Sequence, residues 1–135
     1  MKTLVSAVAV VALMGTVGAA EAAQCTTKYL TGLWFGAADE EDPTYCAVQF
    51  KTNGWITEAS CIDPPVLKST MTWTGRFTVT KDCSVTGNFD GTAKNGRKFN
   101  YKYSGTMDPK RGIIKGTMKV RNGPSATYDF VQQWN

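Results

Sequence analysis

The side chains with which this chain could perform covalent chemistry are few and scattered. The sequence contains no histidine, so the most common general base and metal ligand is missing. Asp90 and Asp108 fall in or near expected turns, and Asp129 is expected to face outward, so that no two of these carboxylates form a pair. No phosphate-binding loop, dinucleotide fingerprint or nucleophile elbow occurs. The sequence therefore predicts a protein that is not an enzyme.

Two groups of residues have metal-binding chemistry, and neither has the spacing of a metal site. The four cysteines lie far apart and include no C-x-x-C pair, which argues against zinc. The acidic run from Asp39 to Asp42, followed by Pro43, is expected to form a solvated loop. It lacks the alternating ligands of the usual calcium loop. We expect neither a metal ion nor another cofactor.

An export signal is expected over residues 1–22, and a single domain over residues 23–135. Lys2 supplies the positive end, residues 4–17 the apolar region, and residues 20–22 a small-x-small cleavage site. This apolar run is too short for a membrane span, and no other run approaches that length. A buried N-terminal helix is the alternative. We expect a soluble protein without a transmembrane segment, secreted to the periplasm or outside the cell.

The cysteines are expected to form two disulfides, because they are even in number in an exported chain. Asn53-Gly54 is a strong hairpin signal between two strand-like runs. A two-residue turn there places Cys46 directly opposite Cys61, within the distance that a disulfide tolerates. Cys25 and Cys83 then form the second bond, which ties the N-terminal segment to the rest of the domain.

Strand-like segments account for most of the domain. The one longer connection, residues 62–70, contains Pro64-Pro65, which cannot donate to a sheet ladder. A meander of this length favours closure, because closure removes exposed strand edges. The expected fold is all-β, an eight-stranded antiparallel up-and-down β-barrel with two disulfides; a two-sheet β-sandwich is the alternative. The expected strands cover residues 32–37, 45–52, 55–61, 71–79, 83–92, 98–107, 112–121 and 125–134.

Loop lengths and the alternation of side chains agree on one inward face from residue 71 onward. The expected loops cover residues 80–82, 94–96, 108–111 and 122–124. The expected pairs on the inward face are Trp73 with Phe89, Phe89 with Tyr101, Gly87 with Tyr103, Tyr103 with Gly116, and Gly116 with Phe130.

Aromatic side chains dominate the expected interior. One interpretation is a small barrel filled by large side chains opposite glycines, without a cavity. The other is an aromatic ligand pocket with a few polar groups, in which Trp55, Trp73, Tyr101, Tyr103 and Tyr128 contact the ligand. The whole set of expected interior aromatics is Trp55, Trp73, Phe77, Phe89, Phe99, Tyr101, Tyr103, Tyr128, Phe130 and Trp134.

Charge is distributed unevenly along the chain. Residues 37–63 contain six acids and one base, whereas residues 76–121 contain eleven bases and three acids. One interpretation of the bases is edge protection and solubility. The other is a surface for an anionic polymer, an acidic protein or membrane headgroups; nucleic acid is not expected, since no exposed aromatics accompany the bases. The bases expected on one outer face are Lys98, Lys102, Lys115, Lys119 and Arg121.

The start of the domain resembles calycin barrels, the superfamily of avidin and lipocalin-like proteins. Gly32-Leu33-Trp34 matches the Gly-x-Trp that these proteins carry on their first strand, and the preceding Leu30-Thr31 is similar to the avidin branch. Residues 72–75 are similar to a Trp-containing stretch of streptavidin-type proteins. The resemblance implies an eight-stranded up-and-down barrel, secretion, a small ligand in the barrel mouth, and Trp34 packed at the barrel base.

This chain departs from avidins directly after that motif. Phe35-Gly36 stands where avidins place polar residues that bind biotin, so the resemblance does not imply a biotin site. Alternation also leaves open whether Trp34, or Leu33 and Phe35, faces inward.

Two functions are expected from these observations. The first is a secreted, non-catalytic protein that holds a small, partly aromatic or apolar ligand in the barrel mouth. The second is an extracellular protein-interaction or inhibitor module that acts through the basic outer face.

Overall fold

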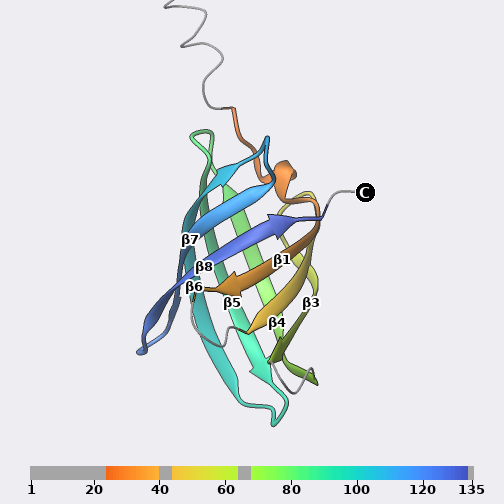
Figure 1. Cartoon of the computed structure of the whole chain (residues 1–135), viewed down its shortest axis with the longest axis vertical. Coiled ribbons are helices and arrows are strands. Elements are labelled where there is room, and N and C mark those ends of the chain that lie inside the picture. Colours follow the sequence, from red (N-terminus) through yellow and green to blue (C-terminus); the bar gives the residue numbers. More distant parts are fainter. Residues whose placement is uncertain (1–23, 40–43, 64–67, 134–135) are drawn as a thin grey trace, which may run out of the picture.

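The chain folds into a closed antiparallel barrel of eight strands (Figure 1). The computed structural model describes residues 24–39, 44–63 and 68–133, and the expected signal at residues 1–22 lies outside them. Each strand pairs with the next one in sequence, and β1 also pairs with β8. The barrel is thus confirmed and the sandwich alternative is wrong. The strands are β1 (Gly32–Ala38), β2 (Tyr45–Phe50), β3 (Ile56–Asp63), β4 (Lys68–Val79), β5 (Ser84–Ala93), β6 (Lys98–Asp108), β7 (Ile113–Val120) and β8 (Ser125–Gln132).

The inward face from β4 to β8 is the expected one, although three pairings differ by two residues. The β4–β5 loop is longer than expected, because Val79 pairs with Val85 and leaves five residues between them. A slip of two residues preserves which side chains face inward, whereas a slip of one would reverse them. The observed pairs are Trp73 with Gly91, Phe89 with Tyr101, Gly87 with Tyr103, Tyr103 with Met118, and Gly116 with Tyr128.

A bulge between β2 and β3 overturns one expectation about the interior. The register shifts after Gln49, so that Phe50 pairs with Ile56 instead of Thr57. The extra residue on β3 reverses the faces of the residues before it. Trp55 is consequently 48% exposed on the outside of the barrel. Its expected interior position is wrong.

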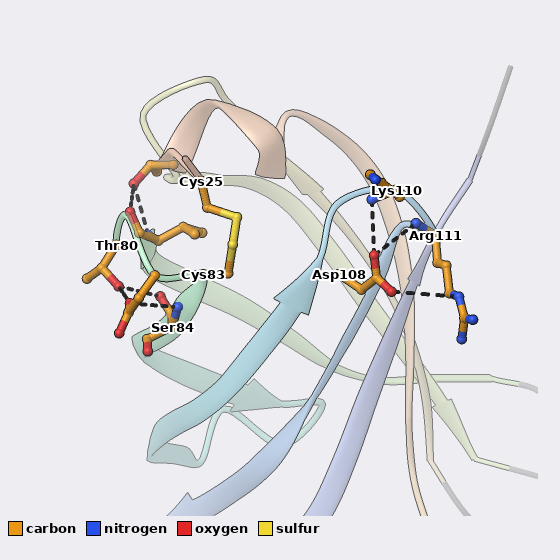
Figure 2. Close-up of a disulfide and its surroundings, with 10 residues drawn as sticks. Cys25, Thr80, Cys83, Ser84, Asp108, Lys110 and Arg111 are labelled. Atoms are coloured by element: carbon orange, nitrogen blue, oxygen red, sulfur yellow. Dashed lines mark hydrogen bonds and ion pairs between the residues drawn. A yellow bond between two sulfur atoms is a disulfide. The ribbon is translucent and has the colours of Figure 1, made fainter. Parts of the chain in front are cut away.

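Both expected disulfides are present. Cys46 and Cys61 are directly paired residues of β2 and β3, with their Cα atoms 4.0 Å apart. Cys25 and Cys83 join the N-terminal segment to the β4–β5 loop, with their Cα atoms 5.0 Å apart (Figure 2). Disulfides of this kind are typical of oxidising compartments.

A short 3-10 helix, η1 (Thr27–Leu30), closes the barrel end that carries the Cys25–Cys83 bond. The Thr27 hydroxyl accepts a hydrogen bond from the Val79 backbone N–H at 3.0 Å, which fixes η1 against β4. Trp34 is 1% exposed, and its indole N–H donates to the Leu30 carbonyl at 2.7 Å. Trp34 therefore faces inward, and its neighbour Phe35 is 47% exposed. In the described part of the chain no helix has the length and apolar character of a membrane span.

Aromatic rings fill the half of the barrel interior that lies toward η1. Phe77 lies at the centre, with ring centroids 5.1 Å from Phe50, 5.3 Å from Phe89 and 5.9 Å from Phe130. Gly87 faces the Phe77 ring, and a methyl group on this glycine would come within 2.8 Å of it. The rings and the glycine therefore pack closely around Phe77.

Candidate ligand site at the open end of the barrel

The end of the barrel opposite η1 contains a cavity of about 600 Å³ that opens to solvent. Met71 and Trp73 on β4 line it, whereas Val79 at the other end of the same strand contacts η1. The β5–β6 and β7–β8 turns therefore surround the mouth, at the lower end of Figure 1. The lining residues are Ala38, Thr44, Cys46, Cys61, Met71, Trp73, Ala93, Phe99, Tyr101, Met118, Val120, Pro124, Ser125, Ala126 and Tyr128.

The floor of the cavity is a layer of aromatic rings that continues into the packed core. Trp73 lies 4.5 Å from Phe89 and 6.1 Å from Tyr128 between ring centroids. The Tyr101 ring stacks on the Phe89 ring, with the centroids 5.3 Å apart. These tilted and stacked rings make the floor of the cavity apolar and aromatic.

Three tyrosines supply the polar groups near this floor, and burial raises the pKa of each phenol above its usual value of 10.0. They are therefore neutral hydrogen-bond donors at physiological pH. The Tyr103 hydroxyl donates to the Tyr128 carbonyl at 2.7 Å, and the Tyr101 hydroxyl lies 3.5 Å from the Met71 sulfur. Tyr128 is only 5% exposed, and its hydroxyl has no hydrogen-bond partner among the described residues.

Four of the five residues predicted to contact a ligand lie at this end of the interior or directly beneath it. Trp73, Tyr101 and Tyr128 line the cavity, and Tyr103 is buried one layer deeper. Trp55 lies on the outer surface, where the Arg76 guanidinium is 5.8 Å from its ring centroid.

Sequence reasoning did not place the cavity's aliphatic and methionine lining at a ligand site. Met71, Met118 and Val120 face inward where β4 and β7 approach the mouth. Their signal in the sequence was the inward alternation near a turn, because inward side chains at strand ends form the mouth of a barrel.

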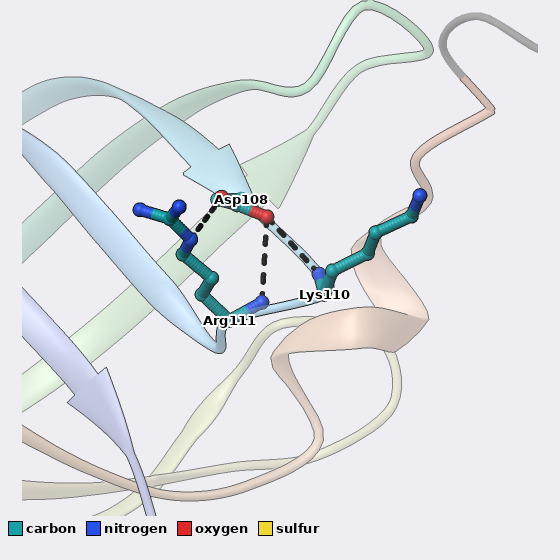
Figure 3. Close-up of polar contacts among 3 residues, drawn as sticks. All are labelled: Asp108, Lys110 and Arg111. Atoms are coloured by element: carbon teal, nitrogen blue, oxygen red, sulfur yellow. Dashed lines mark hydrogen bonds and ion pairs between the residues drawn. The ribbon is translucent and has the colours of Figure 1, made fainter.

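The three candidate acids have structural partners, and none of them lines the cavity. The Asp108 carboxylate accepts hydrogen bonds from the backbone N–H groups of Lys110 and Arg111 and lies 3.7 Å from the Arg111 guanidinium, so that it holds the β6–β7 turn (Figures 2 and 3). Asp90 accepts from the Asn100 amide at 3.1 Å, and Asp129 from the Gly116 N–H at 3.4 Å. The described residues contain no cluster of three or more metal-ligating side chains of histidine, cysteine, aspartate or glutamate.

Four of the five basic residues predicted on the outer face surround two adjoining recesses. Lys102 and Lys119 are directly opposite each other on β6 and β7, and with Arg121 they line a recess of about 420 Å³. Lys98 and Arg121 line a second recess of about 330 Å³. Lys115 lies farther along β7, where it is paired with Asp129 of β8. None of these five side chains forms an ion pair within the described ranges.

Comparison with known proteins gives no family for this chain. No protein-family model matches it. No curated protein matches it. No solved structure matches it. The eight-stranded antiparallel barrel is compatible with a calycin-like fold. The Gly32-Leu33-Trp34 motif pointed to the same architecture.

Proposed function

We propose that this protein is a secreted, non-catalytic binding protein of calycin type that holds a small, partly aromatic or apolar ligand in the mouth of its barrel. The observation that carries the proposal is the open cavity of about 600 Å³ above a floor of aromatic rings. Its size lies within the range of roughly 300–1,000 Å³ that is usual for small-molecule sites. The two disulfides support an extracytoplasmic location.

The polar groups at the cavity floor suit recognition better than packing. Buried hydroxyls nearly always have a hydrogen-bond partner, since an unpaired one loses its hydration without compensation. The Tyr128 hydroxyl has none among the described residues, although its ring lines the cavity. The hydroxyl oxygen has almost no accessible surface, so a ligand oxygen or nitrogen would satisfy it only after the surrounding side chains move to admit the ligand.

The neutral fluorophore N-phenyl-1-naphthylamine tests this proposal, because its emission rises in an apolar site. Ala93 lies on β5 beside Met71 and lines the cavity. Its replacement by phenylalanine places a ring inside the mouth, so that Ala93→Phe should weaken binding of the fluorophore by about tenfold or more.

The control is Thr92→Phe, which adds a ring of the same kind to the neighbouring residue. Thr92 pairs with Lys98 on the outer side of the barrel and does not line the cavity. Binding should therefore persist in Thr92→Phe. Equal binding by both variants, or no binding by the wild-type protein, contradicts the proposal.

The basic outer face supports a second candidate function, an interaction module for an acidic extracellular partner. Lys102 and Lys119 face each other without a described carboxylate partner, and like charges placed directly opposite destabilise a sheet. An anionic partner would relieve this repulsion. Lys102→Glu with Lys119→Glu should abolish salt-sensitive binding to heparin if this function holds, and should leave N-phenyl-1-naphthylamine binding unchanged.

A further inference from the structure

The wall of the barrel mouth is incomplete on one side, between β6 and β7. The last pair of these strands joins Tyr101 to Val120, and the Arg121 N–H donates to the Asn100 carbonyl at 2.9 Å. Lys98 and Phe99 extend beyond that contact, because β6 begins before β7 has a residue to pair with them. Within the described ranges, β6 therefore has no strand partner on its β7 side beyond Asn100.

Phe99 and Val120 lie between the cavity and a recess on the outer surface, and we call this pair of side chains the lip. Both side chains line the cavity of about 600 Å³, and both also line the outer recess of about 330 Å³. The remaining lining of the outer recess is polar, and consists of Asp90, Lys98, Asn100, Arg121 and Asn122. An apolar space and a polar space thus meet at one pair of side chains.

Cations surround this lip. The Arg97 guanidinium lies 5.1 Å from the centroid of the Phe99 ring, and Lys98 and Arg121 line the recess beside it. No ion pair within the described part of the chain uses any of these three cations. The one acid of the recess, Asp90, accepts a hydrogen bond from the Asn100 amide. The lip therefore carries excess positive charge that this part of the chain does not neutralise.

The described residues that line the cavity behind the lip carry no charge. Its lining is apolar apart from Thr44, Ser125 and the two tyrosines Tyr101 and Tyr128, whose pKa values burial raises. A charged group would lose its hydration inside without gaining an opposite charge. A charged group at the lip, by contrast, keeps its contact with water and gains the nearby cations.

We infer that the ligand of this cavity is an anionic amphiphile, with its apolar body in the barrel mouth and its single negative group at the Phe99–Val120 lip beside Arg97, Lys98 and Arg121. The inference rests on the proposed binding function and adds the chemical class of the ligand to it. A carboxylate, sulfonate or phosphate satisfies the requirement, because the planar guanidinium groups of arginine bind each of these through paired hydrogen bonds.

The test uses two fluorophores with the same aromatic body. N-phenyl-1-naphthylamine is neutral, and 8-anilinonaphthalene-1-sulfonate carries one sulfonate in addition. The wild-type protein should bind the sulfonate roughly two- to fivefold more tightly than the neutral compound, as expected for an exposed charge pair. The difference should decrease with added salt.

The variant Lys98→Gln with Arg121→Gln removes two lip cations, and both side chains are exposed. It should bind the neutral fluorophore unchanged and lose the preference for the sulfonate. Lys110→Gln with Arg111→Gln makes the same two replacements at the closed end of the barrel, in the β6–β7 turn. This control should retain the preference.

Each other outcome has a separate meaning. If the wild-type protein binds both fluorophores equally, the inference about charge is wrong while the binding function stands. If it binds neither, the proposed function fails and the inference falls with it. If the sulfonate alone binds, and binds Ala93→Phe as well as the wild type, the anion site is superficial and the amphiphile is excluded.

Discussion

Replacing Tyr128 with phenylalanine is expected to stabilise the barrel when no ligand is bound. The Tyr128 side chain is 5% exposed, and its hydroxyl finds no partner among the described residues. A buried hydroxyl in this state costs about 1–3 kcal/mol, because it has exchanged water for no other partner. Removing the oxygen leaves the ring contacts with Trp73 and Phe130 in place. The free energy of unfolding of Tyr128→Phe should therefore rise by about 1–2 kcal/mol.

Tyr103→Phe is the matched control, with the opposite expected sign. Its hydroxyl is also buried, but it donates to the Tyr128 carbonyl at 2.7 Å. Loss of a satisfied buried hydrogen bond should lower the free energy of unfolding by about 0.5–1.5 kcal/mol. The two variants delete the same atom type from neighbouring tyrosines, so a difference in sign isolates the effect of the missing partner.

Urea unfolding of the oxidised, ligand-free proteins measures both values, provided that the denaturant dependence is the same in all three. In a saturating amount of N-phenyl-1-naphthylamine or of the native ligand, each protein gains stability from binding. The native ligand should stabilise the wild type more than Tyr128→Phe if it hydrogen-bonds this hydroxyl. A Tyr128→Phe variant that is destabilised as much as Tyr103→Phe refutes the reasoning.

Further predictions concern the disulfides, alkaline pH and one glycine. Replacing both cysteines of the Cys25–Cys83 bond by alanine should lower the free energy of unfolding by about 4 kcal/mol, and the same change at the Cys46–Cys61 bond should lower it by about 3 kcal/mol. The difference arises because the two bonds close loops of 58 and 15 residues, and the longer loop loses more entropy when it is closed. Urea midpoints in oxidising buffer check this order. Burial raises the pKa of Tyr103 and Tyr128, so the folded protein keeps two phenol protons that the unfolded chain loses at alkaline pH. The free energy of unfolding should therefore be unaffected below about pH 10 and should fall as the pH rises further. Circular dichroism can follow this loss of stability. A methyl group on Gly36 would lie 2.5 Å from a neighbouring tyrosine ring, so Gly36→Ala should lower the unfolding free energy by roughly 1–3 kcal/mol in the same urea assay.

Parity explains why the barrel could be predicted from the sequence. Inward side chains recur at every second residue, and loops that err by two residues leave the inward set unchanged. Trp73 and Tyr103 therefore face inward as expected, although their cross-strand partners differ. The pairing of Cys46 with Cys61 was predicted correctly because two deviations cancel: the turn is one residue longer than expected, since Lys51 bonds Trp55, and the bulge after Gln49 restores the expected register.

Trp55 shows the limit of the same argument. The Asn53-Gly54 signal predicts a two-residue turn, but the Lys51 N–H donates to the Trp55 carbonyl and the register shifts by one residue nearby. An odd shift turns Trp55 outward, and a bulge has no local signal comparable to Asn-Gly.

Whether the interior held a cavity could not be predicted from alternation alone. Phe77 and its neighbours fill one half of the barrel and a cavity occupies the other, and the use of that cavity as a ligand site stays a prediction. The volume of the cavity depends on how far each strand extends beyond its neighbour at the mouth, as β6 does at Phe99. These strand lengths are fixed only when the sheet closes into a barrel, so alternation along a single strand does not give them.

Native mass spectrometry of the oxidised protein, purified unheated from its own host, shows whether the barrel mouth holds a ligand. We expect an additional mass that departs on denaturation, that carries a negative charge, and that is absent from Ala93→Phe purified in the same way. A bare polypeptide in both preparations, still bare after incubation with a mixture of metabolites, would contradict the claim that the barrel mouth is a ligand site.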